Sequence, residues 1–256
     1  MNRNIKLIIA YDGTEFHGWQ RQAGFRTVQG EIENALFKMH GHHVGVSGCG
    51  RTDSGVHAKG QAANFITDID SIPADRFSPA LNSLLSRDAR VLESSEVDIN
   101  FHARFSAKSR LYRYQFLCGT SRDSGFSFLP YETRYNLRLR RYPSLEILNS
   151  YGRLLLGETD CSIFADSGDS AVTEGRSKNR FIYSSYFYME KDSLIFEIRA
   201  NAFLRKMVRS VAGTFLRYEE IGAPPAKMRE IIASGDRSLA GPTLPPCGLF
   251  LWNVEY

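Results

Sequence analysis

The strongest constraint on the fold is a helical stripe of apolar residues that begins near position 203. Apolar residues recur there at the spacing of one helix face, so the segment must bury that face against another element. Asn201 is in place to cap this helix, and Arg205 and Arg209, one turn apart, lie along one edge of the stripe. The stripe consists of Phe203, Leu204, Met207, Val208, Val211, Ala212, Phe215 and Leu216. The sequence therefore predicts a long, half-buried helix in the second half of the chain.

Strand-like segments surround this helix and also fill the first half of the chain. The pattern predicts strands over residues 5–11, 61–67, 90–92, 111–117, 181–189, 194–200 and 249–256. It predicts helices over residues 27–41, with Thr27 as the cap, over residues 79–85, and from Pro143 onward. The element types are mixed without a strict strand-helix-strand alternation, which favours α+β over a doubly wound sheet. Two α+β halves are predicted, residues 1–103 and residues 104–256.

Residues 48–58, Gly-Cys-Gly-Arg-Thr-Asp-Ser-Gly-Val-His-Ala, isolate one carboxylate in a glycine-rich run. The glycines are Gly48, Gly50 and Gly55. They predict a tight, open-walled turn that another molecule can approach closely. Asp53 sits there beside Thr52, two residues after Arg51 and four before His57, and a carboxylate in polar company is a candidate for catalysis. The structural alternative is a turn in which Asp53 hydrogen-bonds the local backbone.

Positive charge is concentrated in residues 101–141, which hold nine basic and two acidic residues in a chain of net charge +4. The basic residues are Arg104, Lys108, Arg110, Arg113, Arg122, Arg134, Arg138, Arg140 and Arg141, interleaved with Phe105, Tyr112, Tyr114 and Tyr135. Arginine forks onto phosphate oxygens and stacks on bases, so this mixture suits RNA. The alternative is a basic surface without a function.

Several classes of protein are excluded by missing signatures. No phosphate-binding loop, dinucleotide fingerprint or nucleophile elbow occurs, which argues against ATP, dinucleotide and serine-hydrolase chemistry. Four scattered cysteines and six histidines lack metal-site spacing, and the cluster at 40–43 is typical of a solvated helix end. No apolar run approaches a membrane span, and the N-terminal residues read as a strand rather than a secretion signal. We therefore expect a reduced, cytoplasmic protein with no cofactor and no metal.

An aspartate can act as a covalent nucleophile on a sugar carbon. Ordinary glycosidases need a second carboxylate as the partner acid, for which Asp12 and Glu15 are candidates in a separate turn. Asp53 remains the one carboxylate that the sequence isolates.

Segments spread along the chain resemble a known family. The central segment is Gly-Arg-Thr-Asp-Ser-Gly-Val-His-Ala at residues 50–58. The others, in order, are residues 11–14, 16–22, 26–29, 80–85, 101–107, 112–114 and 201–209. They cover the chain from end to end, with a weaker match over residues 119–142 and 162–180. On these segments the chain resembles the bacterial tRNA pseudouridine synthase A family.

The resemblance implies that uridine is isomerised to pseudouridine in the tRNA anticodon stem and loop, at positions 38, 39 and 40, without cofactor or metal. It implies Asp53 as the nucleophile and Tyr112 as the residue that stacks on the target uracil. Arg209 is expected to pair with Asp53 and keep it ionised. Arg51 is expected to hold the displaced nucleotide or to fill the gap it leaves. The implied fold has two similar α/β halves joined through a continuous, mostly antiparallel sheet with helices packed on one face, and the implied assembly is a tRNA-binding homodimer.

Two other functions would use the same residues. A nucleoside glycosylase would break the same C–N bond and release the free base, whereas a non-catalytic RNA-binding protein would use only the basic segment. Single residues also have structural alternatives. Tyr112 could be an ordinary strand aromatic and Arg209 a solvated residue on a helix face, while Trp19 could pack in the core instead of lining an RNA path with Gln20.

Overall fold

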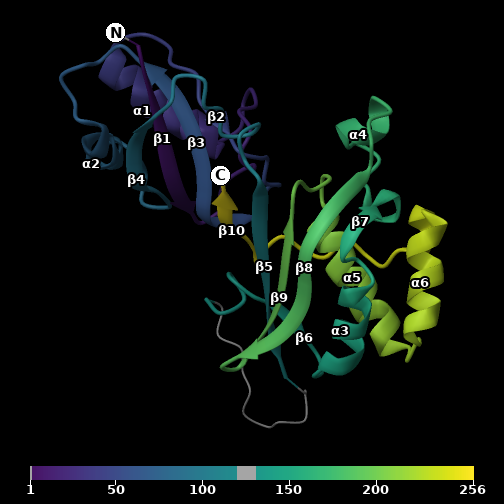
Figure 1. The fold of residues 1–256 in the computed structure, drawn as a ribbon. Helices are drawn as coiled ribbons and strands as arrows, with labels where there is room; N and C mark the ends of the chain where they lie inside the picture. The colour runs from purple at the N-terminus through teal and green to yellow at the C-terminus, as the bar shows by residue number, and fades with distance from the viewer. Residues whose placement is uncertain (1, 120–130) are drawn as a thin grey trace. The chain divides into compact units, whose positions relative to one another are not determined.

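The computed structural model describes residues 2–119 and 131–256, which form two compact units (Figure 1). The first unit comprises residues 1–108 and 250–256, and the second comprises residues 109–249. The last strand is part of the first unit, where it pairs with β3, whereas the predicted halves, 1–103 and 104–256, place it with the second. That division into halves remains a prediction about domains.

The first unit is a mostly antiparallel sheet with helices on one face. Its elements are β1 (Arg3–Tyr11), α1 (Val28–His40), β2 (Ser47–Gly48), β3 (His57–Thr67), a 3-10 turn (Ala74–Arg76), α2 (Phe77–Asn82), β4 (Ala89–Val97) and β10 (Leu249–Glu255). The strand order is β4-β1-β3-β10, with β10 parallel to β3 and the short β2 also paired to β3. Phe65 of β3 packs edge-on against Phe77 of α2, with 5.5 Å between ring centroids. The Asp53 loop connects β2 to β3, so strands fix both of its ends.

Helix α1 follows the local signals in the sequence. The Thr27 hydroxyl accepts a hydrogen bond from the Gly30 amide at 3.3 Å, which satisfies one of the open donors of the first turn. Gly41 ends the helix in the left-handed region at φ 75°, a conformation that glycine adopts without strain. The predicted helix over residues 27–41 is confirmed.

The second unit also consists of a sheet and a set of helices. Its elements are β5 (Ser109–Cys118), β6 (Leu137–Leu139), α3 (Leu145–Arg153), β7 (Gly157–Asp160), α4 (Ser170–Thr173), β8 (Asn179–Glu190), β9 (Ser193–Ala200), α5 (Met207–Glu220) and α6 (Pro225–Ser234), with 3-10 turns at Ser162–Phe164 and Arg237–Leu239. The strand order is β5-β9-β8-β7, all antiparallel, and β6 pairs parallel to β5. Helices α3, α5 and α6 gather beside this sheet (Figure 1). Phe215 of α5 contacts both Phe196 of β9 and Tyr151 of α3, so the apolar stripe of α5 supplies the core of this unit.

The start of α5 differs from the prediction. The helix begins at Met207 rather than after Asn201, and Lys206 before it is left-handed, with φ 59°. The Asn201 side chain accepts hydrogen bonds from the amides of Ala202 at 2.8 Å and Phe181 at 3.1 Å instead of capping a helix. The expected position of Arg205 on the helix was therefore wrong.

The physical reason lies in two acidic residues just before α4, Asp166 and Asp169. Lys206 Nζ lies 2.7 Å from Asp166 Oδ2, and the Arg205 amide donates to the Asp169 carboxylate. These contacts hold the backbone before Met207 outside helical geometry, although its apolar spacing is helical. Tertiary contacts here override the local pattern.

The predicted fold class, a mixture of helices with a mostly antiparallel sheet, is confirmed. The hairpin over residues 181–200 is also confirmed by β8 and β9. The helix predicted from Pro143 onward is α3, which starts after Ser144, whose hydroxyl accepts from the Ile147 amide, and ends at Arg153. Among the helices described, none is long and apolar enough to cross a membrane.

Candidate active site

The Asp53 loop is held by backbone hydrogen bonds from a second loop of the first unit. The Thr52 carbonyl accepts from the Trp19 amide at 3.2 Å, and the Gly55 amide donates to the Phe16 carbonyl at 3.2 Å. Within the loop, the Val56 amide donates to the Asp53 carbonyl at 3.1 Å. The half-buried Asp53 thus lies in a turn that residues 16–19 fix from outside.

Glycines allow these two loops to pack backbone against backbone. A Cβ atom at Gly13 would overlap the Val56 carbonyl, and one at Gly18, which has φ 82°, would lie 2.5 Å from the Thr52 carbonyl oxygen. Both positions therefore require glycine. Residues 11–22 and 48–57 form one interlocked pair of loops, which we call the loop pair.

The expectation of an open-walled turn is wrong at Gly48. A Cβ there would lie 2.5 Å from the Trp19 ring, which fills the space, and Trp19 is only 2% exposed. Trp19 is therefore a core residue and does not line a path for RNA. At Gly50, by contrast, no atom of the described residues lies within 4 Å of such a Cβ.

Arg51 lies with Gln20 on the surface of the loop pair. The exposed Arg51 donates from Nε to Gln20 Oε1 at 3.2 Å, and Gln20 Nε2 donates to Gln29 Oε1 at 2.7 Å. The next residue, Thr52, is buried, and its hydroxyl bonds the Tyr11 hydroxyl at 2.7 Å. Arg51 and Asp53 therefore lie on either side of Thr52, whose buried side chain holds the loop to Tyr11.

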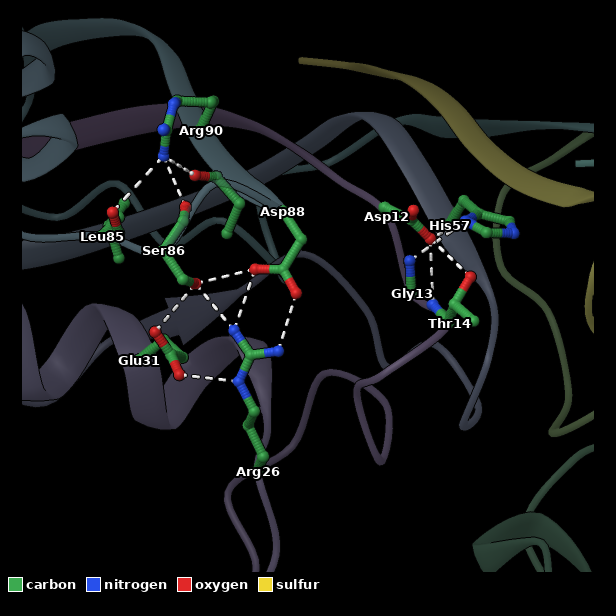
Figure 2. A network of polar contacts seen from close by, with 11 residues as sticks. Asp12, Gly13, Thr14, Arg26, Glu31, His57, Leu85, Ser86, Asp88 and Arg90 are labelled. Carbon is green, nitrogen blue, oxygen red and sulfur yellow. Dashed lines mark hydrogen bonds and ion pairs between the residues drawn. The ribbon is translucent and has the colours of Figure 1, made fainter. Parts of the chain in front are cut away.

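His57, the last residue of the loop pair, is buried, and its ring lies beside Asp12 and Gly13 (Figure 2). Its Nδ1 accepts from the Gly13 amide at 3.0 Å and lies 3.2 Å from Asp12 Oδ1, and its ring stacks on Phe250 at 4.7 Å. The same Asp12 oxygen accepts from the amide of Thr14 at 3.1 Å and from its hydroxyl at 2.6 Å. Asp12 therefore shapes its own turn, which weakens its candidacy as a partner acid.

A second polar network, around Arg26 and Asp88, lies next to the loop pair (Figure 2). Arg26 forks onto Asp88, with Nη1–Oδ2 2.7 Å and Nη2–Oδ1 2.8 Å, and its Nε donates to Glu31 at 2.9 Å. The Arg26 guanidinium also lies over the Phe16 ring, 4.2 Å from its centroid. The Asp12 amide donates to the Asp88 carbonyl at 2.9 Å, so this network reaches both ends of residues 12–26.

Electrostatics stabilise the pair between Arg26 and Asp88. The hydrogen bonds from Arg26 hold the pKa of the Asp88 carboxyl below its ordinary 3.8, and the bonds to Asp88 and Glu31 raise the pKa of Arg26. Neither residue is predicted to have a role from the sequence. Arg26 lies in the matching segment 26–29, but nothing in the sequence indicates Asp88 as its partner.

Replacing Arg26 with Met is expected to lower the free energy of unfolding by about 1–3 kcal/mol at pH 7, because it leaves Asp88 without its charged partner. Since folding depresses the pKa of Asp88, this stabilisation is complete above its ordinary pKa and is lost as the pH falls below it. Urea denaturation at pH 7 and pH 3 should show a difference between wild type and variant that shrinks in acid. The Arg76→Met control removes an exposed pair to Asp75 and should change little; equal losses in both variants would contradict the prediction.

The other two predicted site residues lie in the second unit. Tyr112 of β5 is 9% exposed and meets the ring of Phe203 edge-on, with 5.0 Å between centroids. Arg209 of α5 is half-buried, and its Nε donates to the Leu244 carbonyl at 2.6 Å. Two strand positions from Tyr112, Tyr114 is fully buried and donates to the Pro245 carbonyl, and burial raises its pKa. The segment 244–245 thus receives hydrogen bonds from both β5 and α5.

The basic residues of 101–141 differ in their exposure, and two of them pair with carboxylates. Arg113 pairs with the buried Glu197, Nε–Oε2 2.7 Å, and Arg141 pairs with Glu219. Glu197 also accepts from the Tyr186 hydroxyl at 2.5 Å, and burial with this bond raises the pKa of Tyr186 to about 12. The exposed residues are Arg104, Lys108, Arg134, Arg138 and Arg140. The half-buried Arg110 donates from Nη1 to the Asn201 carbonyl at 2.6 Å, and Arg122 lies outside the described residues. Arg113 and Arg141 are therefore partly structural, and the RNA footprint remains a prediction.

Cysteine and metal chemistry receive no support from the described residues. They contain no cluster of three His, Cys, Asp or Glu side chains that could hold a metal ion. All four cysteines are free, and burial raises the pKa of Cys118 to about 11 and that of Cys161 to about 12. These two thiols are therefore poor nucleophiles.

The chain is similar to proteins of one kind along nearly its whole length. A family model described as tRNA pseudouridine synthase matches residues 7–106 and 153–256. The chain is 50% identical to tRNA pseudouridine synthase A of Treponema denticola, over 99% of this chain and 93% of that protein. It is 44% identical to the protein of the same name from Treponema pallidum strain Nichols, over 94% and 84%, and 42% identical to that of Caldicellulosiruptor saccharolyticus, over 99% and 100%.

Proposed function

The chain belongs to the tRNA pseudouridine synthase family and is an isomerase that makes pseudouridine in tRNA, and we propose that it acts on positions 38, 39 and 40 of the anticodon stem and loop. Formation of pseudouridine in tRNA follows from membership of the family. The proposed positions are supported by the segments in which the chain resembles the pseudouridine synthase A family, the loop around Asp53 above all.

The reaction exchanges one bond to the ribose for another. The N1–C1′ bond of uridine breaks, a C5–C1′ bond forms, and C5 gives up a proton while N1 gains one. The exchange is redox-neutral, so the proposal includes neither a cofactor nor a metal. Asp53 is the proposed nucleophile, because a carboxylate can form a covalent intermediate that divides one difficult step into two.

The observation that carries this role is the way in which the loop of Asp53 is fixed. Buried Thr52 and the carbonyl of Phe16 anchor the turn on both sides of a half-buried carboxylate. A carboxylate positioned by rigid elements loses little freedom when it attacks, and such preorganisation lowers the barrier. The exposed Arg51 beside it is available to a nucleotide that leaves its stack.

Tyr112 and Arg209 have proposed roles in the complex with tRNA. We propose that Tyr112 stacks on the target uracil and that Arg209 favours the ionised form of Asp53. We also propose that the enzyme binds tRNA as a homodimer. These roles rest on the family segments at residues 112–114 and 201–209 and on the family as a whole.

Product analysis of transcribed tRNA tests the proposed reaction and its positions. After incubation with the enzyme, the tRNA is digested to nucleosides and the modified positions are mapped. We expect pseudouridine at positions 38–40 and no free uracil, and no product from a matched transcript with cytidine at those positions. Free uracil without pseudouridine would instead support a nucleoside glycosylase, and product elsewhere would contradict the proposed positions.

A further inference from the structure

An exposed aromatic ring stands on a tightly held loop of the first unit. The loop, residues 98–106, follows β4, and its Phe105 side chain is 75% exposed. Single exposed apolar residues are common on protein surfaces and need no function. The way in which this loop is built distinguishes Phe105 from such residues.

Two buried asparagines hold the loop to the sheet. Asn4 of β1 donates to the carbonyls of Asp98 at 3.0 Å and Phe101 at 2.9 Å. Asn64 of β3 donates to Asn4 Oδ1 at 3.0 Å and accepts from the Ala103 amide at 2.9 Å. Asn4 and Asn64 are 1% and 7% exposed, and buried amides are costly unless they are bonded. Here both amides use hydrogen bonds to hold the backbone of the loop 98–106.

The tip of the loop is closed by its own hydrogen bonds. The Ser106 amide donates to the His102 carbonyl at 2.9 Å, and the His102 amide donates to the Ser106 hydroxyl at 3.1 Å. The Arg104 amide donates to His102 Nδ1 at 3.1 Å, and the Tyr256 hydroxyl donates to the Ala103 carbonyl at 2.9 Å. The residues on both sides of Phe105 are thereby fixed.

The groups around the ring match the chemistry of an unpaired nucleotide. The His102 ring lies 4.5 Å from the Phe105 ring, tilted by 40°, and the Arg104 guanidinium lies 5.6 Å from it. An aromatic face stacks on a base, while a neighbouring guanidinium attracts its phosphate. From this arrangement we propose that Phe105 stacks on an unpaired base of the bound tRNA and that Arg104 contacts the adjacent phosphate. The inference rests on the proposed function in that tRNA is the substrate.

The base bound by Phe105 is not the target uridine. The Asp53 loop enters β3 at His57, whereas the loop of Phe105 is held at Asn64, seven residues along the same strand. At the rise of a β-strand, about 20 Å separate His57 from Asn64. The loop of Asp53 begins at β2, beside Asn64, but the Asp53 carbonyl accepts from the Val56 amide. Val56 is next to His57. Phe105 is therefore assigned to a nucleotide other than the target and to positioning the tRNA.

The test compares Phe105→Ala and Phe105→Trp with a matched control, Phe37→Ala. Phe37 lies on α1 in the same unit and is 53% exposed. Loss of one stacked base is expected to weaken tRNA binding by Phe105→Ala about 5- to 100-fold. We expect KM to rise while kcat at saturating tRNA is kept, Phe105→Trp to bind like wild type, and Phe37→Ala to change nothing. Thermal unfolding of Phe105→Ala should match wild type because the ring is exposed.

Salt dependence separates stacking from charge. Phe105→Ala should leave the slope of log affinity against log salt unchanged, and Arg104→Ala should reduce it by about one phosphate contact. Unchanged tRNA binding by Phe105→Ala, or an equal loss in Phe37→Ala, would overturn the proposal, as would a fall in kcat without a rise in KM. The binding assay does not depend on turnover. If the wild-type enzyme made no pseudouridine, that result would contradict the proposed function, and the effect of Phe105→Ala on tRNA binding would still test the role of Phe105.

Discussion

Replacing Asp53 with Asn is expected to reduce pseudouridine formation on the order of a thousand-fold or more, the scale seen when a nucleophile is removed. The amide has the shape of the carboxylate but cannot attack carbon as an anion. The turn itself should persist, because the bond from Val56 goes to the Asp53 carbonyl rather than to its side chain. Binding of tRNA should therefore be nearly unchanged.

Release of tritium from the uracil C5 position measures this turnover, since C5 loses its hydrogen when it bonds to C1′. Single-turnover reactions with excess enzyme separate chemistry from binding, and filter binding reports affinity. Ser54→Ala is the matched control: Ser54 is exposed in the same turn, and its hydroxyl donates only a 3.3 Å bond to the Phe16 carbonyl. Wild-type turnover by Asp53→Asn would show that Asp53 is not the nucleophile.

Replacing Gly13 with Ala is expected to lower activity by about a hundred-fold, because a misplacement of about 1 Å at a reactive group can cost that much. The new methyl group would overlap the Val56 carbonyl, so the backbone three residues after Asp53 must move. Overpacking of this kind is also expected to lower the free energy of unfolding by about 1–3 kcal/mol. Gly13 itself bears no functional group, so the loss reports on the position of the loop.

Single-turnover rates and urea denaturation measure the two effects of Gly13→Ala. Gly45→Ala is the control, because the nearest atom to a Cβ there, among the residues described, is His43 Cε1 at 3.9 Å. It should preserve both rate and stability. A Gly13→Ala enzyme with wild-type activity would mean that the loop pair tolerates displacement and that its backbone packing does not position Asp53.

Elements set by local signals were predicted well from the sequence. Helix α1 begins after Thr27 and ends before Gly41 because the side-chain cap and the left-handed glycine act within a few residues. The start of α5 was predicted wrongly because Asp166 and Asp169, about forty residues earlier, decide it. The spacing of apolar residues carries no information about such distant partners.

In the candidate site, too, the sequence indicated residues that lie in one continuous run but not partners that are far apart in the chain. The run of residues 48–58 marked Asp53 and Arg51, and their roles remain predictions. What the sequence could not indicate was that the space at Gly48 is occupied by Trp19 or that Arg26 finds Asp88 across 62 residues. A glycine in the sequence indicates that another group can approach closely, but not which group does. An arginine indicates a positive charge, but not which carboxylate pairs with it.

The pairing of β10 with β3 has a consequence for how the protein is made. His57 and Ala58 pair with Phe250 and Leu251, which follow them by roughly 190 residues. At 5–20 residues per second, a ribosome needs about 10–40 s to synthesise that interval. During this time the β3 edge beside the Asp53 loop is without its β10 neighbour, and open strand edges are prone to pair with other chains. The strand pairing beside the Asp53 loop is therefore completed only when the C-terminal residues have been synthesised.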